Sequence, residues 1–214
     1  MNDDIEYKGY IIKVKQDEDA YDPREDAGEQ AMGIMNCMHG RYNLGDKHDH
    51  KSDDFNGWDG FEKHLVEEHD AAIILPLYLY DHSGITMSVS SFSCQWDSGQ
   101  VGFIYTTNER IKNLYAIKRV TKAKLKQAEK ELIGEVDVYD KYIKGEVYIS
   151  IIENKDGEML DTYGGCYDYN EAEREAKCNI DGIVEDNRKR KQKKVKAMIT
   201  NHVPLEKRQQ LVTA

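Results

Sequence analysis

The segment from residue 76 to residue 107 constrains the fold of this chain more than any other. Apolar side chains alternate with other residues in its first part, at Leu77, Leu79, Ile85, Met87 and Val89. A second alternation closes the segment, at Val101, Phe103 and Tyr105. Alternation of this kind is the period of a half-buried strand. The segment therefore predicts three strands joined by two turns.

Both turns are polar and contain Asp, Ser and Gly. The first runs from Asp81 to Gly84 and the second from Trp96 to Gln100. We expect Gly84 and Gly99 to adopt positive φ, which glycine does without steric cost. Polar turns at strand ends are where a rigid scaffold presents functional groups, so Asp81, Trp96 and Asp97 are candidate binding residues.

The rest of the chain predicts further strands and helices. Strands are expected over 7–15, 135–143, 146–153 and 158–163, with an Asp-Gly hairpin signal at Asp156-Gly157. Helices are expected over 60–69, 108–115, from Thr121 as N-cap to Gly134 as the terminating residue, and from about 170 to 199. Core positions of the first helix are Phe61, Leu65 and Val66, and the last helix begins with a capping box of Asn170 and Glu173.

These elements predict an α+β fold. A mainly antiparallel sheet would be built from the strands near 7–15 and 76–106, with a C-terminal three-stranded meander plus helix. The expected division is an acidic N-terminal α+β part over 1–120, a connecting helix over 121–134, a meander plus helix over 135–187, and a basic tail over 188–214. A chain of 214 residues is long enough to bury a substantial core.

Composition favours a cytoplasmic protein. No apolar run approaches the length needed to span a membrane, and the acidic N-terminus lacks the features of a secretory signal. The four cysteines are far apart and form no CxxC pair, which is typical of reduced, buried thiols.

Charge is distributed unevenly along the chain. Residues 1–110 carry 22 acidic and 9 basic side chains, whereas the remainder carries 18 and 21. The segment Arg188–Lys196 alone has seven bases in nine residues. An acidic front half repels nucleic acid and favours a partner protein with a basic surface, or a cation. The basic tail could contact nucleic acid, an acidic partner, or the acidic half of its own chain.

Several motifs resemble those of one family. They are Tyr7-Lys8-Gly9-Tyr10, Asp22-Pro23-Arg24-Glu25, Arg41 to Asp46, the DHSG string at Asp81–Gly84, the WDSGQVG string at Trp96–Gly102, and Tyr139 to Tyr142. The resemblance covers most of residues 7–180 and is to a family of uncharacterised hypothetical proteins from tailed bacteriophages and mobile elements. The chain departs from the family pattern at Gln95, where relatives carry Pro, and at Asp26, where the motif usually continues with Trp. The resemblance implies a phage-borne protein in the cytoplasm of a bacterial host.

A concentration of histidines suggests a metal site. Six of the seven fall between residues 39 and 82, among several aspartates. His48 and His50, with Asp46, could ligate zinc, manganese or iron, although a solvated polar loop explains the same pattern. No HExxH motif occurs, and His64 and His69 are five apart, a spacing that fits poorly on one helix face.

The acidic segment at 16–30 is the other candidate binding region. Asp17, Asp19, Asp22 and Glu25 lie on an expected exposed loop that lacks EF-hand spacing, and Arg24 could bridge carboxylates with both of its terminal nitrogens. The chain has no GxSxG elbow, no GxGxxG and no phosphate-binding loop, so acyl hydrolysis and nucleotide binding have no support.

Three functions follow from these features. The leading one is a phage accessory protein without a cofactor that binds and inhibits a host protein, plausibly a defence nuclease, as anti-CRISPR or anti-restriction proteins do. An acidic surface would occupy a basic nucleic-acid groove. The alternatives are a metal-dependent hydrolase that uses the His/Asp cluster, and a nucleic-acid-binding protein that acts through Arg188–Lys196.

Overall fold

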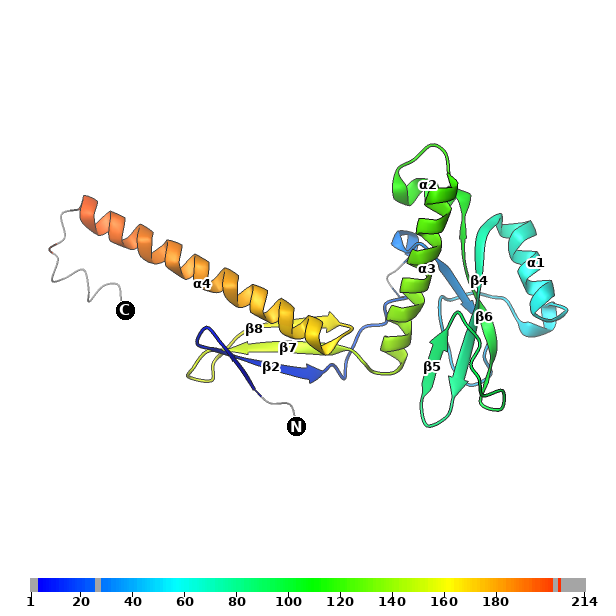
Figure 1. Ribbon diagram of the computed structural model, residues 1–214, viewed down its shortest axis with the longest axis horizontal. Coiled ribbons are helices and arrows are strands. Elements are labelled where there is room, and N and C mark those ends of the chain that lie inside the picture. The colour runs from blue at the N-terminus through cyan, green and yellow to red at the C-terminus, as the bar shows by residue number, and fades with distance from the viewer. Residues whose placement is uncertain (1–3, 26–27, 202–203, 205–214) are drawn as a thin grey trace. The chain divides into compact units, whose positions relative to one another are not determined.

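A computed structural model of the protein describes residues 4–25, 28–201 and 204, and it has two compact units (Figure 1). Unit 1 combines residues 1–17 with 147–214, and unit 2 is the continuous segment 18–146. Each unit has its own four-stranded antiparallel sheet, so the fold is α+β as predicted. The division predicted from the sequence had instead placed the strand over 7–15 and the meander over 135–187 in different parts of the chain.

The sheet of unit 2 contains the three central strands predicted from the sequence. Its order is β3-β6-β4-β5, with bounds Ile34–Cys37, Ser98–Thr107, Ala71–Asp81 and Ile85–Ser88. The register pairs Leu79 with Met87 on one side and Leu75 with Ile104 on the other. The apolar residues of neighbouring strands thus lie opposite one another, and their burial on the same face fixes the register.

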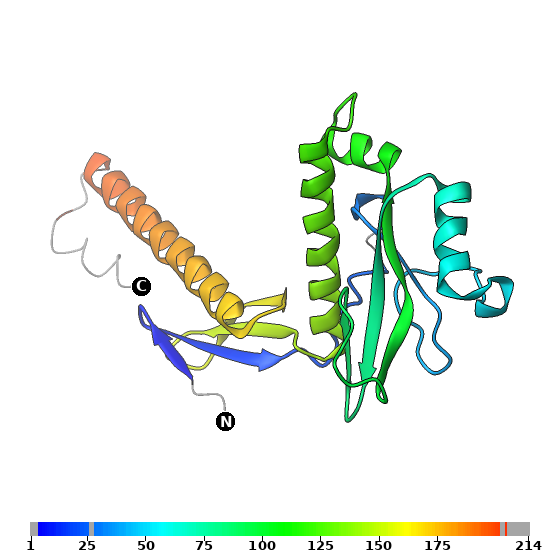
Figure 2. The same ribbon diagram turned by 45° about the vertical axis from the view of Figure 1, so that its right-hand side comes forward.

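Helices cover both faces of this sheet (Figure 2). On one face, α3 (Lys122–Ile143) packs Leu132 and Val136 against Leu77 and Met87, with α2 (Asn108–Tyr115) beside it. On the other face, α1 (Gly57–His69) packs Phe61 and Leu65 against Phe103 and Tyr105. Val66, expected in that core, is 50% exposed. Two short 3-10 turns, Gly28–Gln30 and Ser52–Asp54, complete the unit.

The helix predicted to end at Gly134 continues to Ile143, so the strand predicted over 135–143 is wrong. The start was predicted correctly, since the Thr121 side chain accepts a hydrogen bond from the Lys124 amide. The buried stripe continues beyond Gly134 at Val136 and Tyr139, at helical spacing. Burial of that stripe outweighs the cost of about 1 kcal/mol for a glycine inside a helix.

Only one of the two central turns uses glycine as predicted. Gly84 has φ of +145°, and Ser83 before it has φ of +54°. Gly99, in contrast, lies inside β6 opposite Leu79 and has no positive φ, so that prediction is wrong. The connection from β5 to β6 is a longer loop that ends at Asp97.

Unit 1 contains the strand predicted over 7–15. The order of its sheet is β1-β2-β7-β8, with bounds Ile5–Tyr7, Tyr10–Gln16, Tyr148–Glu153 and Met159–Cys166. The first strands therefore pair with the C-terminal hairpin and not with the sheet of residues 76–106. The strand predicted over 158–163 is present as β8, whereas the place of the one predicted over 135–143 is taken by β2, because Ile12 and Val14 pair with Ile152 and Ser150 and bury the same face.

The last helix, α4, runs from Tyr169 to Thr200. Its N-cap is Asp168, whose carboxylate accepts hydrogen bonds from the amides of Asn170 and Glu171, so the capping box predicted at Asn170 is wrong. Only Ala172, Ala176 and Ile180 are buried, against the sheet of unit 1. Within the described ranges, no helix has the length and apolarity needed to cross a bilayer.

Candidate functional site

The predicted binding residues Asp81, Trp96 and Asp97 line one hollow in unit 2. This hollow, called here the Trp96 hollow, has a volume of about 360 Å³ and is lined by His39, Arg41, Leu79, Asp81, Trp96, Asp97, Ser98, Gly99, Gln100 and Val101. Its residues come from the β3–α1 connection, the end of β4 and the start of β6. Trp96 lies on the loop before β6 and is 97% exposed.

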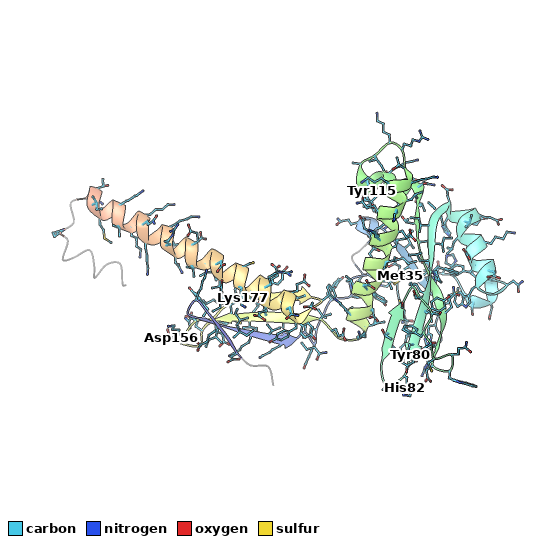
Figure 3. All side chains as sticks on the ribbon, in the orientation of Figure 1. Met35, Tyr80, His82, Tyr115, Asp156 and Lys177 are labelled. Carbon is cyan, nitrogen blue, oxygen red and sulfur yellow. The ribbon has the colours of Figure 1, made fainter. Side chains whose placement is uncertain are left out.

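Polar contacts order the walls of the Trp96 hollow. The Asp81 carboxylate forms an ion pair with the Arg41 guanidinium and accepts a hydrogen bond from the Tyr42 hydroxyl at 3.4 Å. The Asp97 carboxylate lies 3.5 Å from Nδ1 of His82, which Figure 3 places at the tip of the β4–β5 turn. The main chains of Asp81 and Asp97 are joined by an amide-to-carbonyl bond of 2.8 Å. These contacts join the segments of the wall, and the tryptophan beside them is exposed.

These contacts do not assemble a hydrolytic triad. Ser98 donates its hydroxyl to the carbonyl of Cys94, so its proton is directed toward the main chain. The pair of His82 and Asp97 is largely exposed, and the Ser98 hydroxyl bonds to neither. The arrangement is suited to contact and charge recognition, with a large aromatic side chain beside two carboxylates and one guanidinium.

The other four predicted binding residues do not form one surface. Asp17 belongs to unit 1, whereas Asp19, Asp22 and Glu25 belong to unit 2. Asp22 is half-buried and accepts the Arg24 amide at 2.8 Å, and burial raises the pKa of its carboxyl group. Glu25 is exposed and lies 3.8 Å from the Lys47 ammonium. Asp19 and Glu25 are exposed, while Asp22 has a structural role.

Arg24 is the centre of a buried ion network, which agrees with the bridging role predicted for it. Its guanidinium donates two hydrogen bonds of 2.7 Å to Asp46, one of 3.0 Å to Glu135, and one of 2.9 Å to the carbonyl of Gly33. Asp46 also accepts the Met35 amide at 2.8 Å. Both oxygens of Asp46 are thus engaged in joining the loop to β3 and α3.

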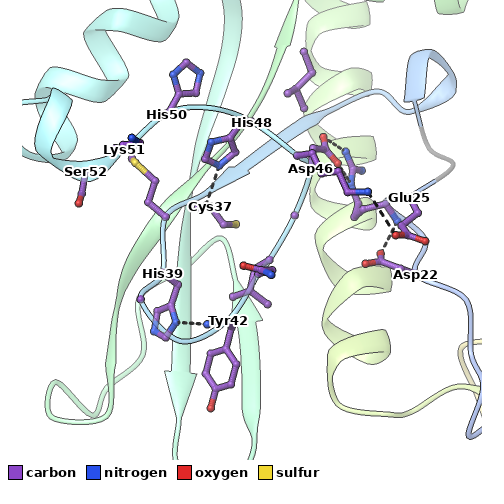
Figure 4. Close-up of a pocket in the computed structure, with 18 of the residues that line it drawn as sticks. Asp22, Glu25, Cys37, His39, Tyr42, Asp46, His48, His50, Lys51 and Ser52 are labelled. Carbon is purple, nitrogen blue, oxygen red and sulfur yellow. Dashed lines mark hydrogen bonds and ion pairs between the residues drawn. The ribbon is translucent and has the colours of Figure 1, made fainter.

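The three predicted metal ligands are therefore separated by their contacts. Asp46 bonds to Arg24, and Nε2 of His48 hydrogen-bonds the carbonyl of Cys37 at 2.9 Å. Figure 4 shows this bond, with His48 and His50 on the loop that follows Asp46 along a polar cavity of about 900 Å³. Burial, and next the neighbouring imidazoles, lower the pKa of His50, so its ring is neutral at pH 7.

The structure brings His50 together with His64 and His69 instead. One ring nitrogen from each of these histidines lies within 4.8 Å of the others. The spacing of five residues between His64 and His69 predicts that their side chains point in different directions from α1. The pair comes into reach because His69 is the last residue of α1 and the loop carries His50 between them.

Comparison of the chain with known protein families, with curated proteins and with solved structures finds no match.

Proposed function

We propose that the protein is a binding protein whose unit 2 holds a partner protein at the Trp96 hollow. The observation that carries this proposal is the 97% exposure of Trp96 on a loop whose neighbours are fixed by hydrogen bonds. Tryptophan is among the residues that contribute most at protein interfaces, where it fills a pocket on the partner. A fully exposed indole beside a wall joined by hydrogen bonds is suited to that role.

The partner should have a basic surface. Unit 2 carries 24 acidic and 15 basic side chains, a formal charge of −9, whereas unit 1 carries 16 and 15. Asp97 at the hollow and the exposed Asp19 and Glu25 contribute to this charge. Complementary charge accelerates encounter, while a buried aromatic anchor slows dissociation.

The resemblance to phage and mobile-element proteins supports a host cell as the setting. The proposed partner is a bacterial host protein with a basic nucleic-acid groove, such as a defence nuclease, which the protein would inhibit by occupying that groove. The choice of a host nuclease as partner rests on the family resemblance and on the acidic charge of unit 2. Trp96 at the hollow would be the aromatic anchor of the interface.

The test uses the full chain as bait in a host lysate and then the purified partner in binding kinetics. Trp96→Ala should raise the dissociation rate at least tenfold, because an interface hot spot contributes about 2 kcal/mol or more. Trp96→Phe should recover part of that loss. Val66→Ala, a 50% exposed apolar position on α1, is the matched control and should bind as the parent does.

The acidic contribution is tested over a salt series. Asp19→Asn combined with Glu25→Gln should slow association at low salt and flatten its salt dependence, since the Debye length is about 8 Å at physiological ionic strength. Asp17→Asn, in unit 1, is the comparison variant. A partner that binds Trp96→Ala as tightly as the parent would show that the Trp96 hollow is not the interface.

A second candidate function is nucleic-acid binding through the C-terminal half of α4. Residues 187–200 are helical and contain no acidic residue. Arg188 and Lys189 pair with Glu185, but five other basic side chains form no ion pair with any described residue: Arg190, Lys191, Lys193, Lys194 and Lys196. A continuous basic helix can lie in the major groove, and phosphate contacts give a steep salt dependence.

Substitutions in α4 distinguish nucleic-acid binding from partner binding at the Trp96 hollow. Lys191→Gln with Lys193→Gln and Lys194→Gln should weaken binding to duplex DNA or RNA and reduce the slope of log K against log salt by about 3. Lys122→Gln with Lys126→Gln and Lys130→Gln on α3 removes equal charge from unit 2 and serves as control. An equal loss of nucleic-acid affinity in both triple variants would indicate non-specific charge attraction and no binding site on α4.

A further inference from the structure

We infer that His50, His64 and His69 form a binding site for a divalent zinc-class cation, which joins the loop after Asp46 to helix α1. Each residue contributes one imidazole nitrogen, and all three nitrogens lie within 4.8 Å of one another. The ring centroids of His50 and His64 are 5.3 Å apart, those of His64 and His69 5.5 Å, and those of His50 and His69 5.8 Å.

These distances are close to those of a bound ion. Zinc–nitrogen bonds of about 2.0 Å in a tetrahedron place the nitrogens about 3.3 Å apart. To hold an ion, the three nitrogens would have to approach one another from 4.8 Å or less to that separation. A bound cation would therefore draw the three histidine nitrogens together.

The surroundings hold the rings in place. Phe55 lies 5.1 Å from the His64 ring, and Phe61 lies 5.3 Å from the His50 ring. Phe61 itself is fully buried against the sheet. An apolar shell behind the ligands limits access of water from one side and leaves the exposed His69 toward solvent.

The donor set selects the class of metal. Three imidazoles and no carboxylate make up the cluster, among the residues that the structure describes. Calcium and magnesium prefer oxygen ligands, whereas imidazole suits zinc, copper, nickel and iron. Zinc is the ion with which the site is best tested, because it accepts three histidines with a fourth position open to water or another donor.

His48 supplies an independent observation beside this cluster. Its ring lies 5.4 Å from the ring of His50, and its Nε2 bonds the carbonyl of Cys37, so the proton is on Nε2. Its other nitrogen, Nδ1, is buried and has no hydrogen-bond partner among the residues that the structure describes. Buried polar atoms are rarely left unpaired, and ligating histidines commonly donate their second nitrogen to a main-chain carbonyl. We therefore take His48 as the candidate fourth ligand.

The experiment is a zinc titration of the full chain, purified without chelator or affinity tag, in competition with a chromophoric chelator. We expect one zinc ion per chain with Kd below about 1 μM, and tetrahedral visible bands when Co²⁺ replaces Zn²⁺. Zinc at about one hundred times its Kd should raise the Tm by about 5 °C or more.

Variants distinguish this site from adventitious binding. His64→Ala and His69→Ala should each lower zinc affinity at least a hundredfold, and His48→Ala should lower it about tenfold. His39→Ala and His82→Ala, two histidines outside the cluster, should leave affinity unchanged. Because His69 is exposed, its variant should keep the parent fold, which far-UV circular dichroism checks.

Two results would overturn the inference. One is the absence of stoichiometric zinc or cobalt binding in the parent, which would leave the three rings as an aromatic cluster without an ion. The other is equal loss of affinity in His69→Ala and His82→Ala. Neither result bears on the Trp96 hollow, so the proposed function is tested separately.

Discussion

The two sheets of this protein have the same number of strands and the same antiparallel pairing, yet their faces are covered differently. In unit 1, α4 covers one face through Ala172, Ala176 and Ile180. In unit 2, α3 and α1 cover opposite faces, and residues 101–106 of β6 are all buried. A strand covered on both sides must be apolar or fully bonded at every position, whereas a strand covered on one side keeps an alternating pattern.

This difference implies that the two units have different stabilities. Among the described residues, the cluster of unit 1 has seven buried members, two of them alanines, while the larger cluster of unit 2 has fourteen. Buried apolar area is the main favourable contribution to folding. We therefore expect unit 1 to unfold before unit 2. Both tryptophans, Trp58 and Trp96, belong to unit 2, so tryptophan fluorescence reports on that unit alone.

The largest expected effect is on unit 2, from Arg24→Ala. This change leaves Asp46 and Glu135 without their cation and removes the bond to Gly33, so it should cost about 3 to 5 kcal/mol. Trp58 fluorescence in urea, in a Trp96→Phe background, measures it. Lys47→Ala, which breaks an exposed pair with Glu25, is the control and should cost less than about 1 kcal/mol. Similar losses from both would contradict a structural role for the network.

Gly102→Ala should also destabilise unit 2, by about 3 kcal/mol. A Cβ atom at Gly102 would lie 1.9 Å from the main-chain oxygen of Asn36, so β3 and β6 could not keep their pairing. Gly99→Ala meets nothing within 4 Å and should change the free energy of unfolding little. Chemical denaturation of both variants checks this, and a large cost at Gly99 would restore the rejected turn prediction.

A smaller effect is expected in unit 1 from Ile180→Ala, of about 2.5 kcal/mol. The variant should lower the circular-dichroism transition while the Trp58 fluorescence transition stays in place. Leu132→Ala in α3 should do the reverse. Coincident shifts of both transitions in either variant would show that the units unfold as one and would break the comparison.

The smallest effect is the response to alkaline pH, which should be concentrated in unit 2. Burial raises the pKa of Tyr139 to about 12, above its unfolded value near 10. The stability that comes from keeping the Tyr139 hydroxyl protonated is thus fully present below about pH 10 and is lost as the pH rises from 10 through 12. At about pH 10.5 the loss should be about 1 kcal/mol or less. Tyr139→Phe should reduce that pH sensitivity, as measured by urea unfolding at pH 8 and 10.5.

The sequence predicted local structure better than long-range partners. Alternation over 76–107 located β4, β5 and β6, because strand period and turn residues are local properties. It did not show that β2 pairs with β7, since nothing within 7–15 encodes a partner so far along the chain. The end of α3 was misplaced because Gly134 was favoured over Gly145, whose φ of +71° follows the last turn.

For the candidate sites, too, local features were predicted better than long-range contacts. Asp81, Trp96 and Asp97 flank turns that the sequence identified, and the fold brings them to one hollow. The predicted ligands Asp46, His48 and His50 share only His50 with the cluster that the fold brings together, because His64 and His69 meet His50 only through the path of a loop over α1. Loop paths depend on tertiary contacts, such as the bond between His48 and Cys37, that no sequence period reports.

The interrupted sequence of unit 1 has a consequence for synthesis. The strands β1 and β2 leave the ribosome before the rest of their sheet, and β7, the partner of β2, follows about 130 residues later. Unit 2 is continuous and can fold during that interval. The amide of Asp17 bonds the carbonyl of Val147 at 2.8 Å, so the two ends of the inserted segment are adjacent in the finished protein. A folded insertion holds those ends nearer than a flexible chain would, which lowers the entropy cost of pairing β2 with β7.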